Sequence, residues 1–139
     1  MDANDIRQFI EALNRCWLEG DAAALARFYH PDVALLPPDM GPLIRGRDAV
    51  VASYREFLDT AELKHFEPVQ VDVYAYPSDG GGTHMVQMIF EVDYVLDGSR
   101  YLEKGMEIYT VVTGADNPQI IWRQQVVLDS RIAGKSGAD

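Results

Sequence analysis

The chain has 139 residues, of which 47% are hydrophobic and 24% are charged, and this length and composition suit one domain with a core of its own. Twelve basic residues against 22 acidic ones give a formal net charge of -10. This charge argues against nucleic acids and anionic membrane surfaces as partners, because both are bound through clustered Lys and Arg. The single cysteine, Cys16, cannot form an internal disulfide, which favours a reducing compartment.

The N-terminus and the hydropathy of the chain predict neither export nor membrane insertion. Asp2 and Asp5 stand where a secretory signal has basic residues before an apolar run. No apolar stretch approaches the roughly 20 residues that span a bilayer. We therefore expect a cytoplasmic protein, with residues 1–132 in a single domain and residues 133–139 as a flexible tail.

Apolar residues in the first half of the chain recur at three- and four-residue steps, which is typical of helices with one buried face. Gly20 marks the end of the first stripe and Pro31 stops the second. A short apolar strand, residues 33–36, follows the second helix. The predicted helices cover residues 6–18, 22–29 and 47–58.

The second half alternates apolar and polar residues, which predicts strands with one buried face. Asp97-Gly98 is the strongest hairpin signal of the chain. A Gly-rich loop at residues 77–82 and a turn at residues 114–118 separate the other strands. The predicted strands cover residues 69–74, 84–96, 101–113 and 119–128.

This order of elements predicts an α+β fold, with three N-terminal helices packed on one face of a strongly curved, mostly antiparallel sheet. Helices laid across a curved sheet leave a conical cavity that is open at one end. Such a cavity is a natural site for a small molecule.

Several short motifs support this plan. In chain order they are Gly20-Asp21, residues 28–33 (FYHPDV), residues 44–50 (IRGRDAV), Asp97-Gly98 and Trp122-Arg123. Together they resemble the NTF2-like superfamily, in particular its SnoaL-like and ketosteroid-isomerase-like branches, over residues 6–130. The resemblance implies the cone-shaped fold but no single activity, because this fold hosts isomerases, cyclases, dehydratases and non-catalytic binders.

The resemblance also allows a comparison with the isomerase site. Ketosteroid isomerases combine a general-base Asp with an oxyanion hole formed by a Tyr and a protonated carboxylic acid. The base position falls on Pro37 and the Tyr position on Leu13, so steroid isomerisation by that mechanism is not expected. The acid position falls on Glu107, and two further tyrosines of the network fall on Tyr29 and Tyr54. These last three are the candidate catalytic residues, with Glu107 as acid or base and the phenols as hydrogen-bond donors.

The sequence leaves open which way Glu107 points. The family register places it in the cavity, whereas the apolar neighbours Met106 and Ile108 favour the opposite arrangement with Glu107 towards solvent. In the cavity it would have few charges nearby, and desolvation would raise its pKa above the reference value of about 4.3.

Aromatic and apolar residues of the predicted helices and strands would form the cavity wall, together with one amide on the last strand. The candidate ligand-binding residues are Trp17, Met88, Phe90, Val92, Trp122 and Gln124. The three histidines are isolated in sequence and the only cysteine is alone, so neither a metal nor another cofactor is predicted.

Two functions remain open at this stage. The first is acid–base chemistry of the isomerase, cyclase or dehydratase type on a small, largely apolar, carbonyl-containing molecule. The second is a non-catalytic module that binds a ligand or forms a dimeric assembly. The resemblance also implies a homodimer through the convex face of the sheet. The residues that alternate with the predicted core positions, and so belong to this face, are Gln87, Ile89, Glu91, Val95, Arg123, Gln125 and Val127.

Overall fold

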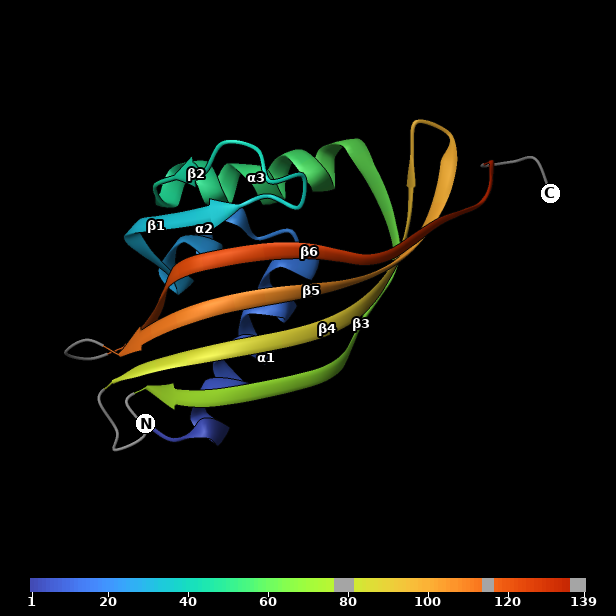
Figure 1. Cartoon of the computed structure of the whole chain (residues 1–139). Coiled ribbons are helices and arrows are strands. Elements are labelled where there is room, and N and C mark those ends of the chain that lie inside the picture. The colour runs from blue at the N-terminus through green and yellow to red at the C-terminus, as the bar shows by residue number, and fades with distance from the viewer. Residues whose placement is uncertain (77–81, 114–116, 136–139) are drawn as a thin grey trace.

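The computed structural model describes residues 1–76, 82–113 and 117–135. In this part of the chain, three α-helices and one 3₁₀ helix pack against a six-stranded sheet. Figure 1 shows that the sheet curls around the helices, with α1 and α2 on its concave side and α3 across its upper edge. The predicted α+β fold is therefore confirmed.

The helices begin at polar caps or glycine. Asp2 and Asp5 form a reciprocal capping box at the start of α1 (Ala3–Leu18). Asp21 caps α2 (Ala22–Leu25), which passes into the 3₁₀ helix η1 (Ala26–Phe28). The helix α3 (Arg47–Thr60) follows Gly46, whose φ of 92° few other residues adopt.

The sheet has the order β2-β1-β6-β5-β4-β3, in which only β1 and β6 run parallel. Asp97 and Gly98 join β4 to β5 with φ values of 50° and 79°, as a tight hairpin turn requires. The strands are β1 (Tyr29–Leu36), β2 (Ile44–Arg45), β3 (Ala61–Tyr76), β4 (Thr83–Leu96), β5 (Ser99–Thr113) and β6 (Pro118–Lys135).

Three strands, β1, β3 and β6, extend well beyond the ranges that the sequence pattern predicted. Tyr29 begins β1 and does not end the second helix, and Pro31 is accommodated where the pairing with β6 is irregular. In the same way β3 starts at Ala61, and Pro68 lies at a bulge opposite β4. The strand β6 continues to Lys135, so Gly134 and Lys135 of the predicted tail pair with β5. Parts of the predicted loop and turn (77–81 and 114–116), and residues 136–139, lie outside the described residues.

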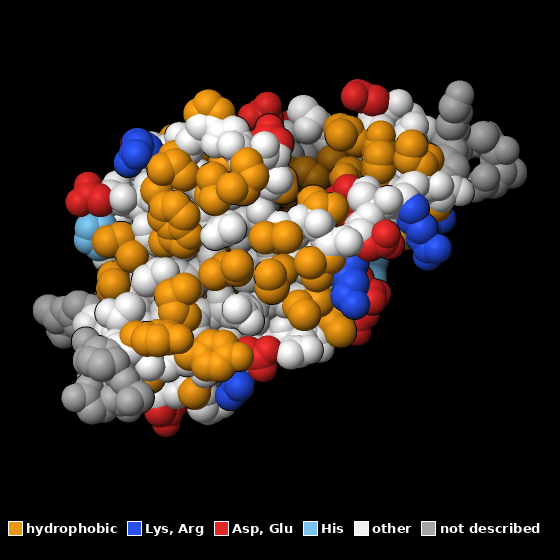
Figure 2. Space-filling view, in the orientation of Figure 1, with side chains coloured by type: hydrophobic (Ala, Val, Ile, Leu, Met, Phe, Trp, Pro, Cys, Tyr) orange, Lys and Arg blue, Asp and Glu red, His pale blue; other side chains and the backbone are white. Residues whose placement is uncertain are grey.

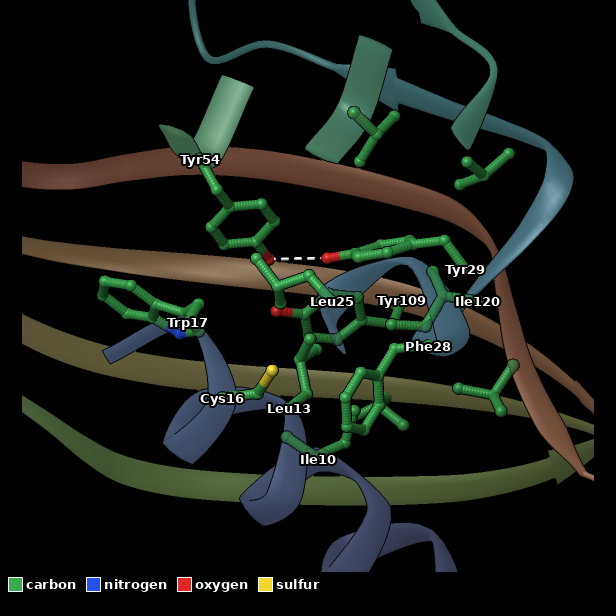
Figure 3. Packing of buried hydrophobic residues seen from close by; sticks show 14 of the residues in the cluster. Ile10, Leu13, Cys16, Trp17, Leu25, Phe28, Tyr29, Tyr54, Tyr109 and Ile120 are labelled. Carbon is green, nitrogen blue, oxygen red and sulfur yellow. Dashed lines mark hydrogen bonds between the residues drawn. The ribbon is translucent and has the colours of Figure 1, made fainter. Parts of the chain in front are cut away.

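The core lies between the helices and the concave face of the sheet (Figure 3). Each helix contributes one apolar face, because a helix repeats about every 3.6 residues. The strands contribute alternate residues, because side chains of a strand alternate between its two faces. Its most deeply buried members are Ile6, Ile10, Leu13, Leu25, Tyr29, Val33, Leu35, Val50, Val86, Met88, Tyr109, Val111 and Ile120.

Gly105 lets the sheet bring an aromatic ring against its concave face. A Cβ atom at this position would lie 2.5 Å from Cζ of Phe90, which is the residue paired with Gly105 on the neighbouring strand. Real Cβ atoms do not approach a ring that closely, so Phe90 keeps its place only because position 105 has no side chain.

We predict that Gly105→Ala lowers the free energy of unfolding by about 2 kcal/mol, because the methyl group overpacks against the Phe90 ring. The measurement is urea denaturation of the wild type and the variant. In a Phe90→Leu background the same change should cost clearly less, since the smaller side chain can move aside. An equal cost in both backgrounds would contradict the proposed clash.

Candidate functional site

A cavity of about 330 Å³ lies between α1, α3 and the concave face of the sheet. Four elements contribute aromatic side chains to its wall: Trp17 from α1, Phe57 from α3, Phe66 from β3, and Phe90 and Tyr94 from β4. Several of these rings contact one another: Trp17 meets Phe66 edge-on at 4.9 Å between centroids, and Phe57 meets Tyr94 at 5.4 Å. The cavity therefore presents flat apolar surfaces to whatever enters it.

A bidentate ion pair lies at the polar end of this cavity. Nε of Arg123 donates to Oε2 of Glu107 at 3.0 Å, and Nη2 donates to Oε1 at 2.9 Å. Gln125 adds a third hydrogen bond, from Nε2 to Oε1, at 3.0 Å. Glu107 and Arg123 are each only 5% exposed, so the two opposite charges compensate each other away from bulk water.

Three buried phenols lie near the ion pair. The hydroxyl oxygens of Tyr29 and Tyr54 lie 2.6 Å apart in a buried hydrogen bond, drawn in Figure 3. The guanidinium carbon of Arg123 lies 4.3 Å from the centre of the Tyr54 ring, which covers one face of the cation. Tyr109 lies on β5, two residues from Glu107, and is fully buried.

The environment keeps these phenols protonated. Burial, followed by the neighbouring Tyr54, raises the pKa of Tyr29 well above its usual value. Burial and the Glu107 carboxylate raise the pKa of Tyr109 in the same direction. The pKa of Tyr54 is also raised by burial, against the opposing effect of Arg123. All three side chains are therefore neutral hydrogen-bonding groups near neutral pH.

The structure decides the orientation that the sequence left open: Glu107 faces the cavity. Met106 and Ile108 alternate with it and lie on the opposite face of β5. The expectation that Glu107 has few charges nearby was wrong, because Arg123 forms a bidentate pair with it.

Other candidate residues divide into two groups. Trp17, Met88, Phe90, Val92 and Tyr54 line the cavity together with Glu107. Tyr29 lies behind Tyr54 and reaches the site only through the hydrogen bond between the two phenols. The roles of these residues in binding or catalysis remain predictions.

Trp122 and Gln124 were predicted on the cavity face, and that prediction was wrong. Ile120 pairs with Val111 and Trp122 with Thr110, so Ile121 is an extra residue in β6. Such a bulge reverses which face the following side chains reach.

The bulge brings Arg123, Gln125 and Val127, which the sequence pattern placed on the convex face, to the cavity wall. Arg123 is the functional residue that sequence reasoning missed. One signal could have found it: an acid at a core position, such as Glu107, requires a buried partner.

A polar contact also lies in the wall formed by α1. Nε1 of Trp17 donates to Oδ1 of Asn14 at 3.1 Å, and Nδ2 of Asn14 lies 3.3 Å from the sulfur of Met88. Within the described ranges, no three His, Cys, Asp or Glu side chains gather as metal ligands would. In the same part of the chain, no helix has the length and apolar character that crossing a membrane demands.

Comparison with known families agrees with the fold. The model of the SnoaL-like domain matches residues 6–115, and the chain therefore belongs to this family. No curated protein matches the chain.

Solved structures share the fold over almost the whole chain. An NTF2-like protein from Cytophaga hutchinsonii has a TM-score of 0.75 at 15% identity, over 92% of this chain and 100% of that one. A proposed scytalone dehydratase from Novosphingobium aromaticivorans has a TM-score of 0.75 at 10% identity, over 96% and 91%. The β subunit of the benzoate 1,2-dioxygenase from Burkholderia mallei has a TM-score of 0.71 at 16% identity, over 91% of both chains. At such identities these structures show the shared NTF2-like fold alone.

We predict that Glu107→Gln lowers the free energy of unfolding by about 3 kcal/mol, because it leaves the Arg123 charge buried without its counterion. The double variant Glu107→Gln with Arg123→Met should recover most of this loss, since no unpaired charge remains. Urea denaturation measures both.

The matched control is Asp93→Asn, which breaks an exposed pair with Arg100 at 2.6 Å and should change stability by less than about 1 kcal/mol. A double variant no more stable than Glu107→Gln would contradict the charge argument.

Proposed function

We propose that this SnoaL-like domain binds a small, largely apolar molecule in the cavity. The observation that carries the proposal is the lining of the cavity, in which rings such as Trp17, Phe66 and Phe90 stand beside the buried Glu107–Arg123 pair. Ligand sites have this form: apolar walls supply contact area, and a few polar groups fix the orientation. The volume of about 330 Å³ lies at the lower end of the usual range for such sites.

Acid–base chemistry of the isomerase, cyclase or dehydratase type is the second candidate. The closeness of Glu107 to Tyr54 at the end of the cavity favours it. Against it, both carboxylate oxygens of Glu107 already accept hydrogen bonds from Arg123, and Gln125 adds another. A general base needs a free lone pair that points at the substrate, and three of the about four acceptor positions of this carboxylate are occupied. The geometry therefore supports binding more directly than proton transfer.

The experiment measures binding of naphthalene, an uncharged flat probe, by equilibrium dialysis. Ser53 lines the cavity on α3, and Ser53→Leu should fill part of the space and weaken binding about tenfold or more. Glu56→Leu is the matched control, because Glu56 is exposed on the same helix. Equal binding by both variants and the wild type, or no binding by the wild type, would contradict the proposal.

We also propose that the chain forms a homodimer through the convex face of the sheet. In Figure 2 hydrophobic side chains gather over the strands on the side away from the helices. On this face Ile89, Met106, Ile108 and Trp122 remain partly exposed, and a contiguous apolar patch rimmed by polar residues is typical of an interaction surface. Trp122 and Gln124 thus replace Arg123, Gln125 and Val127 in the predicted interface.

We predict that the wild type has the mass of a dimer in sedimentation equilibrium at micromolar concentration. Ile108→Lys should shift the mass to that of a monomer, because a charge in the centre of the face would be buried without a partner. Glu56→Lys on the exposed side of α3 is the control and should leave the mass unchanged. A wild-type monomer at this concentration would refute the dimer.

A further inference from the structure

One nitrogen at the polar end of the cavity, Nη1 of Arg123, makes no hydrogen bond to the described part of the chain. Arg123 uses Nε and Nη2 for Glu107, and among the described residues no atom accepts a hydrogen bond from Nη1. If Nη1 were fully buried, it would be a buried polar atom without a hydrogen-bond partner. Among the described residues the only such side-chain atom is Nδ1 of His84. Nη1 is therefore not sealed by protein, and Arg123 lines the cavity.

The direction of this donor is fixed before any ligand enters. The two parallel hydrogen bonds to Glu107 hold the guanidinium in one plane. The Tyr54 ring, 4.3 Å from the guanidinium carbon, prevents it from tilting towards α3. A ligand atom that accepts from Nη1 thus needs no rearrangement of the protein, which favours binding.

The charge of the site decides which acceptor fits. An isolated arginine would suit a carboxylate, but here Glu107 already neutralises Arg123, and both are 5% exposed. The surrounding phenols are neutral, because burial raises their pKa values. A carboxylate would therefore bring an uncompensated negative charge into a desolvated place, whereas a neutral carbonyl oxygen would accept the same hydrogen bond without that cost.

We infer that Arg123 is a specificity-determining residue that selects ligands with a neutral carbonyl oxygen on a flat apolar body and that Glu107, by cancelling its charge, rejects the corresponding carboxylates. This inference rests on the proposed function. In this arrangement Glu107 is a positioning residue, since it acts on the ligand through Arg123.

Three probes of similar shape test the inference by equilibrium dialysis: naphthalene, 2-acetylnaphthalene and 2-naphthoate. The wild type should bind the ketone about tenfold more tightly than naphthalene, which corresponds to one charge-assisted hydrogen bond. It should bind the carboxylate at least tenfold more weakly than the ketone.

Two variants separate the roles of the pair. Glu107→Gln leaves the arginine charge uncompensated and should reverse the order, so that 2-naphthoate binds more tightly than 2-acetylnaphthalene. The double variant Glu107→Gln with Arg123→Met removes both charges, and it should bind ketone and hydrocarbon equally. It also keeps the test valid if the single variant does not fold. Glu56→Gln, on the exposed side of α3, is the control and should behave as the wild type.

The outcomes distinguish the inference from the proposed function. If no probe binds the wild type, the proposed function fails. If naphthalene binds as tightly as 2-acetylnaphthalene, the function stands and the role of Arg123 is overturned. If the wild type prefers 2-naphthoate, the charge argument is overturned.

Discussion

The buried pair between Glu107 and Arg123 is the interaction on which the rest of this site depends. Two opposite charges at 5% exposure are tolerated in a protein interior only when each supplies the counterion of the other. Their two parallel hydrogen bonds also fix the geometry, so that the pair orients the guanidinium as well as neutralising it. The Tyr54 ring and the Gln125 amide complete the surroundings of the pair. The polar end of the cavity is thus a rigid, overall neutral unit.

The aromatic wall and the pair are held by the same curved strands. Gly105 admits the Phe90 ring against β5, and Glu107 lies two residues further along the same face of that strand. A single strand therefore supplies both the close approach that shapes the apolar wall and the carboxylate that anchors Arg123. Because strands of a sheet do not move independently, a ligand would meet a preformed surface. This rigidity suits selective binding and leaves Glu107 little freedom to act as a base.

The sequence determined the elements whose signals are local. Helical stripes, the Asp21 cap and the Asp97-Gly98 turn depend on neighbouring residues, and the structure contains each of them. The same local patterns identified Trp17, Met88 and Phe90 as residues of the cavity wall. The strand ends were less predictable: β1 and β3 run through Pro31 and Pro68, because irregular pairing with a neighbouring strand tolerates what a lone strand would not.

Only the tertiary structure decided what faces the cavity. The side chains of a strand alternate with a period of two, so one extra residue exchanges the faces of everything that follows. The bulge at Ile121 exchanges the faces in this way in β6. No local pattern of the sequence predicts the bulge, since apolar residues lie on both faces of β6 with or without it. As a result Trp122 lies on the convex face and Arg123 on the cavity face, where it forms the ion pair with Glu107. The sequence by itself thus determined the fold and the acid, while long-range strand pairing supplied the arginine that defines the chemistry of the site.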